Sequence, residues 1–332
     1  MAEQNISFTS QGVKLAGNIH TPAGMKKGER RAAFIVLHGF GGNKDAGNVT
    51  KPAQWFLDQG YVVMRFDFRG CGQSEGERGN IICVDQVENT RDAITLLQKR
   101  PDVDPGRIGV VGSSFGAAVA VYTGGVDQRV GAVISSGGWG DGERKFRGQH
   151  PTPEAWSKFT AILEEGKRHR AATGTSLMVP RFDIVPIPQH LRTHLSKTAL
   201  QQFTAETAMS MMDFKADDVI GNISPRPVLL LHSSVDSVTP TEQSIEMFKR
   251  AKQPCDLHLF AETDHFMFDE NNQRVYTLVA QWLDKFFPRP AAKAAAAKPA
   301  KRAAAKAKPK PRAAAKRKPA RKAARGKLRR AA

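Results

Sequence analysis

Cysteine is scarce in this chain of 332 residues. The three cysteines, Cys71, Cys83 and Cys255, show no metal-ligand spacing, and an odd number cannot all pair with one another. Few, unpatterned cysteines exclude a disulfide-stapled framework and are typical of a reducing compartment.

Long apolar runs are also missing. No run approaches the roughly 18 residues that a membrane-spanning helix requires. The first five residues lack the basic region and apolar core of a signal peptide. From these absences we expect a cytoplasmic protein with no transmembrane segment.

Acidic and aromatic residues are absent from Arg289 to the end, although 18 of the 50 Lys and Arg residues lie there. The formal charge of +18 therefore belongs to this tail, because the first 288 residues hold 32 basic and 32 acidic side chains. From Pro288 onward only Ala, Lys, Arg and Pro occur, apart from Gly326 and Leu328. Such a segment buries too little apolar surface to offset an ordering cost of about 1–2 kcal/mol per residue. Residues 288–332 are therefore predicted to be disordered.

The Ala-Lys-Pro repeats of the tail resemble the tails of linker-histone-like proteins. This resemblance implies salt-sensitive, non-specific binding to DNA, RNA or another polyanion, and a nucleoid association. Base stacking is excluded because the tail has no aromatic ring. Polyphosphate, anionic lipid and a storage-granule surface fit the same charge, and a tail that only solubilises the protein is the alternative.

Strand and helix patterns alternate through the body of the chain. Residues 5–22 alternate around a Gln11-Gly12 turn and predict a hairpin. Continuous apolar runs predict buried strands at 32–37, 61–66, 108–111, 130–135, 226–232 and 256–260. Helices are predicted at 51–59, 82–99, 115–122, 241–251 and 271–287. This order indicates an α/β fold with a mostly parallel, doubly wound sheet.

The alternation stops between residues 139 and 221, where a helix is predicted only at 153–170. We interpret 139–221 as a mainly helical cap, or lid, inserted over the carboxyl edge of the sheet. The predicted domains are therefore a core of residues 1–138 and 222–287, the cap at 139–221, and the tail at 288–332.

A serine stands in a glycine-flanked turn directly after one predicted strand. Residues 112–116 read Gly-Ser-Ser-Phe-Gly and fit the pattern G-x-S-x-G with Ser114 at its centre. The chain must reverse so sharply there that side chains two positions either side of Ser114 would collide with the neighbouring strand and helix. Ser114 is therefore a candidate nucleophile.

A serine hydroxyl needs a base to take its proton and an acid to orient that base. In sheets of this kind the partners follow later strands in the order acid, then histidine. Asp236 follows the strand predicted at 226–232, and His265 follows the strand predicted at 256–260. They complete the candidate triad.

Together with the His38-Gly39-Phe40-Gly41-Gly42 loop and the glycine-punctuated turn at 67–76, these motifs resemble the α/β-hydrolase superfamily. Within it the chain is similar to lidded bacterial carboxylesterases of the cinnamoyl and feruloyl type. The resemblance implies ester cleavage through an acyl-Ser114 intermediate, with His265 as base and then acid and Asp236 orienting it. It implies an oxyanion hole made by the backbone N–H groups of Phe40 and Phe115, and it calls for no metal or cofactor.

Several alternatives stay open. Ser113 is the neighbouring rival of Ser114, and Asp264, interpreted as a solvated side chain, is the rival of Asp236. The rival histidines are expected to be structural; they are His20, His38, His232 and His258. Thioesterase, lipase and peptidase activities suit the same triad. A binding protein with vestigial catalysis, localised by its tail, is the alternative of another class.

The predicted cap contributes two further candidates. Its large apolar side chains could line an acyl pocket or only bury the cap on the body; they are Trp156, Phe159, Met178, Phe182, Met209, Met211, Met212 and Phe214. The basic run at 167–170 could meet an anionic substrate such as a CoA ester, but a solvated helix end is the expected interpretation.

Overall fold

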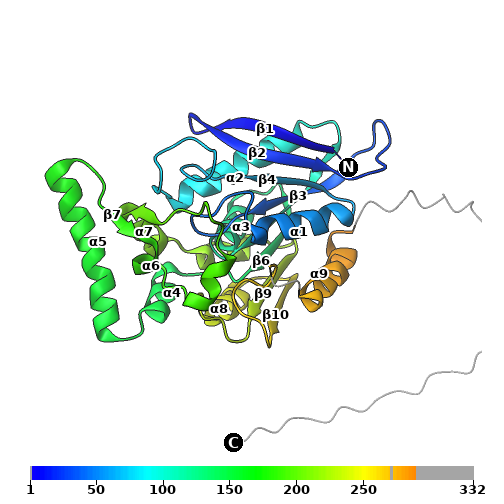
Figure 1. Cartoon of the computed structure of the whole chain (residues 1–332). Coiled ribbons are helices and arrows are strands. Elements are labelled where there is room, and N and C mark those ends of the chain that lie inside the picture. Colours follow the sequence, from blue (N-terminus) through cyan, green and yellow to red (C-terminus); the bar gives the residue numbers. More distant parts are fainter. Residues whose placement is uncertain (1, 270–271, 289–332) are drawn as a thin grey trace, which may run out of the picture. The chain divides into compact units, whose positions relative to one another are not determined.

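The computed structural model describes residues 2–269 and 272–288 of the chain (Figure 1). The predicted disordered segment, 288–332, lies outside these residues except for Pro288. The part described belongs to one compact unit.

The centre of this unit is a sheet of eight strands in the order β1-β2-β4-β3-β5-β6-β9-β10. The pairs β1/β2 and β2/β4 are antiparallel and the remaining pairs are parallel. The strand bounds are β1 Ala2–Ser10, β2 Val13–Thr21, β3 Arg31–Leu37, β4 Val62–Phe66, β5 Val103–Ser113, β6 Val130–Ser136, β9 Val228–Ser233 and β10 Cys255–Phe260. The predicted hairpin and mostly parallel sheet are therefore confirmed.

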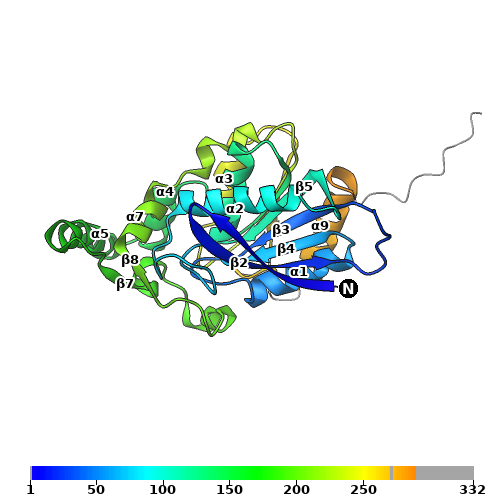
Figure 2. The same cartoon turned by 90° about the horizontal axis from the view of Figure 1, so that it is seen from above.

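Helices cover both faces of the sheet, with α2 and α3 on one face and α1 and α9 on the other (Figure 2). Their bounds are α1 Gly47–Asp58, α2 Cys83–Gln98, α3 Phe115–Val126, α8 Glu242–Arg250 and α9 Gln273–Phe286. Successive residues of β3 contribute to opposite cores: Ala33, Ile35 and Leu37 to the first, and Ala32, Phe34 and Val36 to the second. Burial of the sheet on both faces explains why its strands read as continuous apolar runs.

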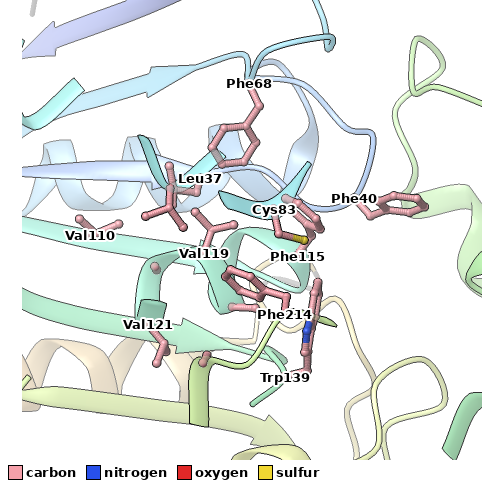
Figure 3. Packing of buried hydrophobic residues seen from close by; sticks show 14 of the residues in the cluster. Leu37, Phe40, Phe68, Cys83, Val110, Phe115, Val119, Val121, Trp139 and Phe214 are labelled. Carbon is pink, nitrogen blue, oxygen red and sulfur yellow. The ribbon is translucent and has the colours of Figure 1, made fainter. Parts of the chain in front are cut away.

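The core on the α2/α3 face continues toward the segment between β6 and β9 (Figure 3). The Phe115 ring centroid lies 6.1 Å from that of Phe40 and 5.6 Å from that of Trp139. Phe214 of the 139–221 segment stacks on Tyr122 of α3, with 4.6 Å between the ring centroids. Aromatic packing therefore joins this segment to the sheet core.

Residues 139–221, which we call the insertion, form helices and a two-stranded sheet between β6 and β9. The α-helices are α4 Gly142–Gln149, α5 Pro153–Thr173, α6 Arg181–Ile184 and α7 Ala205–Asp213, and the strands are β7 Met178–Pro180 and β8 Gln202–Thr204. Three short 3₁₀-helices are η1 Gln189–His194, η2 Ala216–Asp218 and η3 Ile220–Asn222, the last of which ends one residue beyond the insertion. The helix predicted at 153–170 corresponds to α5. Thr152 caps its first turn, accepting from the Ala155 amide, and Gly174 ends it in the left-handed conformation. Figure 1 shows α5 reaching outward from the body.

Among the described residues, no helix has both the length and the apolar character that a membrane crossing requires.

Candidate active site

The turn between β5 and α3 holds Ser114 in an unusual backbone conformation, with φ of 55° and ψ of −116°. A Cβ on Gly112 would lie 2.2 Å from backbone atoms of Gly116. A Cβ on Gly116 would lie 2.6 Å from the His38 carbonyl oxygen. Since the obstructing atoms belong to the backbone, neither glycine can carry a side chain unless the chain moves. The Ser114 amide donates to the Ser136 carbonyl at 2.8 Å, which holds the turn against β6.

The loops after β9 and β10 bring a carboxylate and an imidazole into contact. The Nδ1 of His265 lies 2.8 Å from Oδ2 and 3.1 Å from Oδ1 of Asp236. Both side chains are buried. The amides of Val238 and Thr239 donate to Asp236 Oδ1 at 2.8 and 2.7 Å, so the carboxylate has a fixed orientation. Because the Nδ1–H of His265 donates a hydrogen bond to Asp236, the Nε2 of this imidazole can accept a proton.

His232 of β9 supports the same carboxylate. Its Nε2 lies 2.9 Å from the Thr239 carbonyl oxygen and 3.3 Å from Asp236 Oδ2, while its Nδ1 lies 2.6 Å from the Ser244 hydroxyl. A carbonyl can only accept, so Nε2 carries the proton and Nδ1 accepts from Ser244. Burial acts to raise the pKa of Asp236, but His265 and His232 outweigh it and the pKa falls below its ordinary value. Asp236 is therefore ionised at neutral pH.

Ser114 and His265 line one pocket, whose empty space, including the part open to solvent, is about 490 Å³. The sheet core contributes Gly39, Phe40, Gly42, Ala46, Asn48, Val238 and Phe266 to the lining, and the insertion contributes Arg181, Val185, Ile187, His194, Leu195, Ser196 and Ala199. The pocket therefore lies between the carboxyl edge of the sheet and the insertion, with the serine and the histidine in its wall.

The two amides predicted for an oxyanion hole belong to pocket-wall segments. Phe40 lines the pocket, and Phe115 is the first residue of α3. Within residues 2–269 and 272–288, neither the Phe40 nor the Phe115 N–H donates a hydrogen bond to the protein. His38 braces the loop before Phe40, because its Nδ1 donates to the Gly39 carbonyl at 2.8 Å and its Nε2 accepts from the Phe68 amide at 3.1 Å. Two unused donors in braced segments can stabilise a developing oxyanion.

The rival histidines occupy other positions. His38 and His232 hold loops, as described above. His20 Nε2 faces Arg65 Nε at 3.1 Å across the antiparallel strands, and His258 lies in β10, paired with Leu231. The rival serine, Ser113, is the last residue of β5. None of these side chains lines the pocket that contains Ser114.

Asp264 differs from its expected solvated state. Its Oδ1 accepts from the amides of Ser237 and His265 at 2.9 and 2.8 Å, and its Oδ2 accepts from the Ser237 hydroxyl at 2.6 Å. The carboxylate therefore ties the loop of Asp236 to the loop of His265. Sequence reasoning missed this role because the partner lies 27 residues away in the chain.

The insertion lines the pocket with residues that the sequence analysis did not single out. None of its eight large apolar candidates lines the pocket of Ser114, and several pack into the core instead, among them Phe159, Met211 and Phe214. The insertion's part of the lining comes from residues 181–199, a proline-interrupted stretch whose sequence shows no helical or strand periodicity. The basic run at 167–170 lies on α5, where Lys167 and Arg168 pair with Glu164 and Glu165 in exposed ion pairs.

Among residues 2–269 and 272–288, no group of three or more His, Cys, Asp and Glu side chains is placed to hold a metal ion.

Comparison with known proteins gives relatives of similar architecture. The polyketide transferase grgF of Penicillium sp. is 26% identical over 251 residues, covering 71% of this chain and 82% of the relative. The crystal structure of that α/β hydrolase matches with a TM-score of 0.72 at 22% identity, covering 86% of this chain and 99% of the other.

Two further proteins share the likeness. The thiohydrolase aneE of Aspergillus aculeatus is 26% identical over 281 residues, which is 78% of this chain and 84% of the relative. Est1E of Butyrivibrio proteoclasticus, solved with ferulic acid, matches with a TM-score of 0.61 at 16% identity and covers 85% of this chain and 98% of the other. At that identity Est1E shows a shared fold, so the feruloyl-esterase type stays a prediction.

A family model described as serine aminopeptidase, S33, matches residues 28–272, which contain the serine turn, Asp236 and His265. The sheet order, the serine turn and this match agree, and the chain belongs to this Hydrolase_4 family of the α/β-hydrolase superfamily.

Proposed function

We propose that the protein is a serine hydrolase that cleaves carboxylic esters through an acyl-Ser114 intermediate. The observation that carries the proposal is the pairing of His265 with the buried Asp236 at 2.8 Å, in a pocket whose wall also contains Ser114. The Hydrolase_4 membership supports hydrolysis, and the geometry supports the roles of the three residues.

In the first half-reaction, Ser114 Oγ attacks the ester carbonyl carbon while His265 Nε2 takes the hydroxyl proton. The carbonyl oxygen becomes an oxyanion, which the amides of Phe40 and Phe115 stabilise; each such donor contributes about 3–4 kcal/mol in acyl transfer. The C–O bond to the alcohol then breaks, and the alcohol leaves with the proton from His265. Asp236 stabilises the transient imidazolium and does not itself take the proton.

In the second half-reaction, water replaces the alcohol. His265 takes a proton from the water as its oxygen attacks the acyl carbon of the acyl-Ser114 ester. Collapse of the second tetrahedral intermediate returns the proton to Ser114 Oγ and releases the carboxylic acid. No redox step or external reductant is needed.

A comparison of ester turnover in three proteins tests this function. The wild type and Ser113→Ala should hydrolyse p-nitrophenyl acetate or butanoate, whereas Ser114→Ala should lose activity by at least about 10⁴-fold. Ser113→Ala is the matched control because it removes a hydroxyl one residue away. Absence of Ser114-dependent turnover across esters, thioesters and amides would overturn the proposal and favour a binding role.

Thioester cleavage is the second candidate, and the names of two relatives favour it. One is called a thiohydrolase and the other a polyketide transferase. A thioester would form the same acyl-Ser114 intermediate and release a thiol in place of an alcohol. The ratio of kcat/KM for an acyl N-acetylcysteamine thioester to that for the ethyl ester of the same acid distinguishes the two activities.

A further inference from the structure

Arg181, the first residue of α6, is a buried cation in the wall of the pocket. The residue is 1% exposed, yet it lines the pocket together with Ser114 and His265. Its Nε donates to the Leu200 carbonyl at 2.7 Å, and its amide donates to the Gln201 carbonyl at 2.8 Å. Both contacts are to the backbone of the insertion, so the guanidinium has a defined position.

The charge of Arg181 has no acidic counterpart in the part of the chain that the structure describes. Its Nη2 is buried without a hydrogen-bond partner, and neither Nη atom donates to the protein within that part. Burial lowers the pKa of Arg181 to about 10, which still leaves the guanidinium protonated at neutral pH. A buried cation with four unused N–H donors is unfavourable unless another group satisfies it.

Aromatic rings supply part of this compensation and orient the guanidinium. Its central carbon lies 5.3 Å from the ring centroids of both Phe40 and Phe203, and these rings stack with centroids 4.0 Å apart. A Cβ on Gly41 would lie 2.8 Å from Arg181 Nη2. The guanidinium therefore rests against the loop that carries the Phe40 amide, one of the candidate oxyanion donors.

The pocket lining contains one arginine and no acidic side chain. No Asp or Glu is among its lining residues, whose ionisable members are Arg181, His194 and His265. Both histidines already face carboxylates outside the lining, at 2.8 Å from Asp269 and Asp236 respectively. Of these three residues, only Arg181 faces no acid within residues 2–269 and 272–288. The remaining wall is largely apolar, so the pocket suits a ligand with a carbon chain and one negative charge.

We propose that the natural substrate carries a carboxylate a few bonds from the scissile carbonyl, and that Arg181 binds this carboxylate. Arg181 Nη1, which is not among the buried nitrogens and donates to no protein group in the described part of the chain, can donate to a carboxylate oxygen, and one cation balances one negative charge. The proposal rests on the proposed hydrolase function. It assigns Arg181 to substrate selection, and it explains why a charged side chain is buried where an apolar one would pack more easily.

Matched ester pairs test the proposal in the full-length protein. On the acyl side, the p-nitrophenyl monoesters of glutaric and adipic acid are compared with p-nitrophenyl pentanoate and hexanoate. On the alcohol side, 4-acetoxybutanoate is compared with butyl acetate. In at least one arm the wild type should prefer the acid by about 10- to 100-fold in kcat/KM, the range for a charge-assisted hydrogen-bonded contact.

Variants of Arg181 test whether this side chain causes the preference for the acidic ester. Arg181→Met should abolish the preference, measured as the ratio of kcat/KM within each matched ester pair, and Arg181→Lys should retain part of it. Arg192→Met is the matched control, because Arg192 is an exposed arginine of the insertion outside the pocket lining. A wild type that shows no preference for the acid in either arm overturns the proposal. A preference that survives in both Arg181 variants overturns it too.

Binding without turnover separates this inference from the proposed function. Glutarate and adipate should raise the melting temperature of Ser114→Ala and should not raise that of Ser114→Ala/Arg181→Met. If no ester is cleaved but the dicarboxylates stabilise only the protein with Arg181, the hydrolase proposal fails and the carboxylate site stands. If neutral esters are cleaved and the dicarboxylates have no effect in the presence of Arg181, the carboxylate site fails alone.

Discussion

At the scale of single residues, the backbone turn that holds Ser114 requires glycine at positions 112 and 116, where a side chain would collide with backbone atoms. The closest atoms to a Cβ on Gly112 are backbone atoms of Gly116 at 2.2 Å, which cannot rotate away as a side chain could. Gly106, earlier on β5, would place its Cβ 3.6 Å from the nearest atom. We therefore expect Gly112→Ala to lower the free energy of unfolding by about 1–3 kcal/mol or more. Gly106→Ala should change it by less than about 1 kcal/mol, and urea unfolding measures both.

Asp236 and Asp264 allow a comparison of two neighbouring carboxylates with different tasks. Asp236→Asn should lower kcat/KM by about 10³- to 10⁴-fold, because the amide no longer stabilises the imidazolium of His265. Asp264→Asn should cost less than about tenfold, since Asp264 contacts the backbone of His265 and not its ring. Initial rates on one ester decide the matter, and similar losses in both variants would contradict the assignment.

The sequence reveals some site residues because their signals are local. Ser114 stands inside a five-residue pattern, and Asp236 and His265 each follow a recognisable strand. The structure brings the imidazole of His265 and the carboxylate of Asp236 together, and it places Ser114 in the same pocket wall. Arg181 escapes sequence reasoning, because its importance comes from burial without an acidic partner, which depends on residues distant in the chain.

At the scale of elements, α4 carries a buried lysine that no acid neutralises in the described part of the chain. Lys145 is 2% exposed, its Nζ lies 3.9 and 4.9 Å from the ring centroids of Phe146 and Trp139, and it donates to Gln149 at 3.0 Å. Burial lowers the pKa of Lys145 to about 7, below its value in the unfolded chain. Between these two values the unfolded state binds more protons, so stability rises with pH.

The prediction for Lys145 is a pH-dependent stability. The free energy of unfolding should rise above pH 7 by up to about 1.4 kcal/mol per pH unit from this group. Lys145→Met should remove that rise and stabilise the protein at pH 7 by about 1 kcal/mol or more. Urea unfolding between pH 6.5 and 9 measures the free energy of unfolding of both proteins. Lys158→Met, at a lysine that is 75% exposed, should keep the wild-type slope, and an identical slope in Lys145→Met would refute the assignment.

The strands of the body could be predicted because a sheet that is buried on both faces requires continuous apolar runs in its strands. β3, β4 and β9 lie within a residue or two of their predicted bounds. Within the insertion, the sequence predicted a helix only at 153–170, which corresponds to α5. The pairing of β7 with β8 and the pocket-lining stretch 181–199 depend on contacts between distant segments, which no local pattern encodes.

At the scale of the whole molecule, the chain joins an electrically balanced body to a segment that holds its excess positive charge. We propose that residues 288–332 bind a polyanion such as DNA by counterion release. Binding of the full chain to duplex DNA should weaken by about 10³-fold or more between 50 and 200 mM salt. A truncated chain of residues 1–287 should not bind at 50 mM salt. Fluorescence anisotropy measures both, and equal affinity of the two chains would show that the tail is not the binding segment.

The identity of the nucleophile is the claim on which the rest depends, and peptide mapping after fluorophosphonate labelling tests it most directly. Trypsin releases residues 108–129 as one peptide that contains both Ser113 and Ser114. Fragmentation should place a single adduct on Ser114. The adduct should persist in Ser113→Ala and disappear in Ser114→Ala. An adduct on Ser113, on another peptide, or on none would contradict the account.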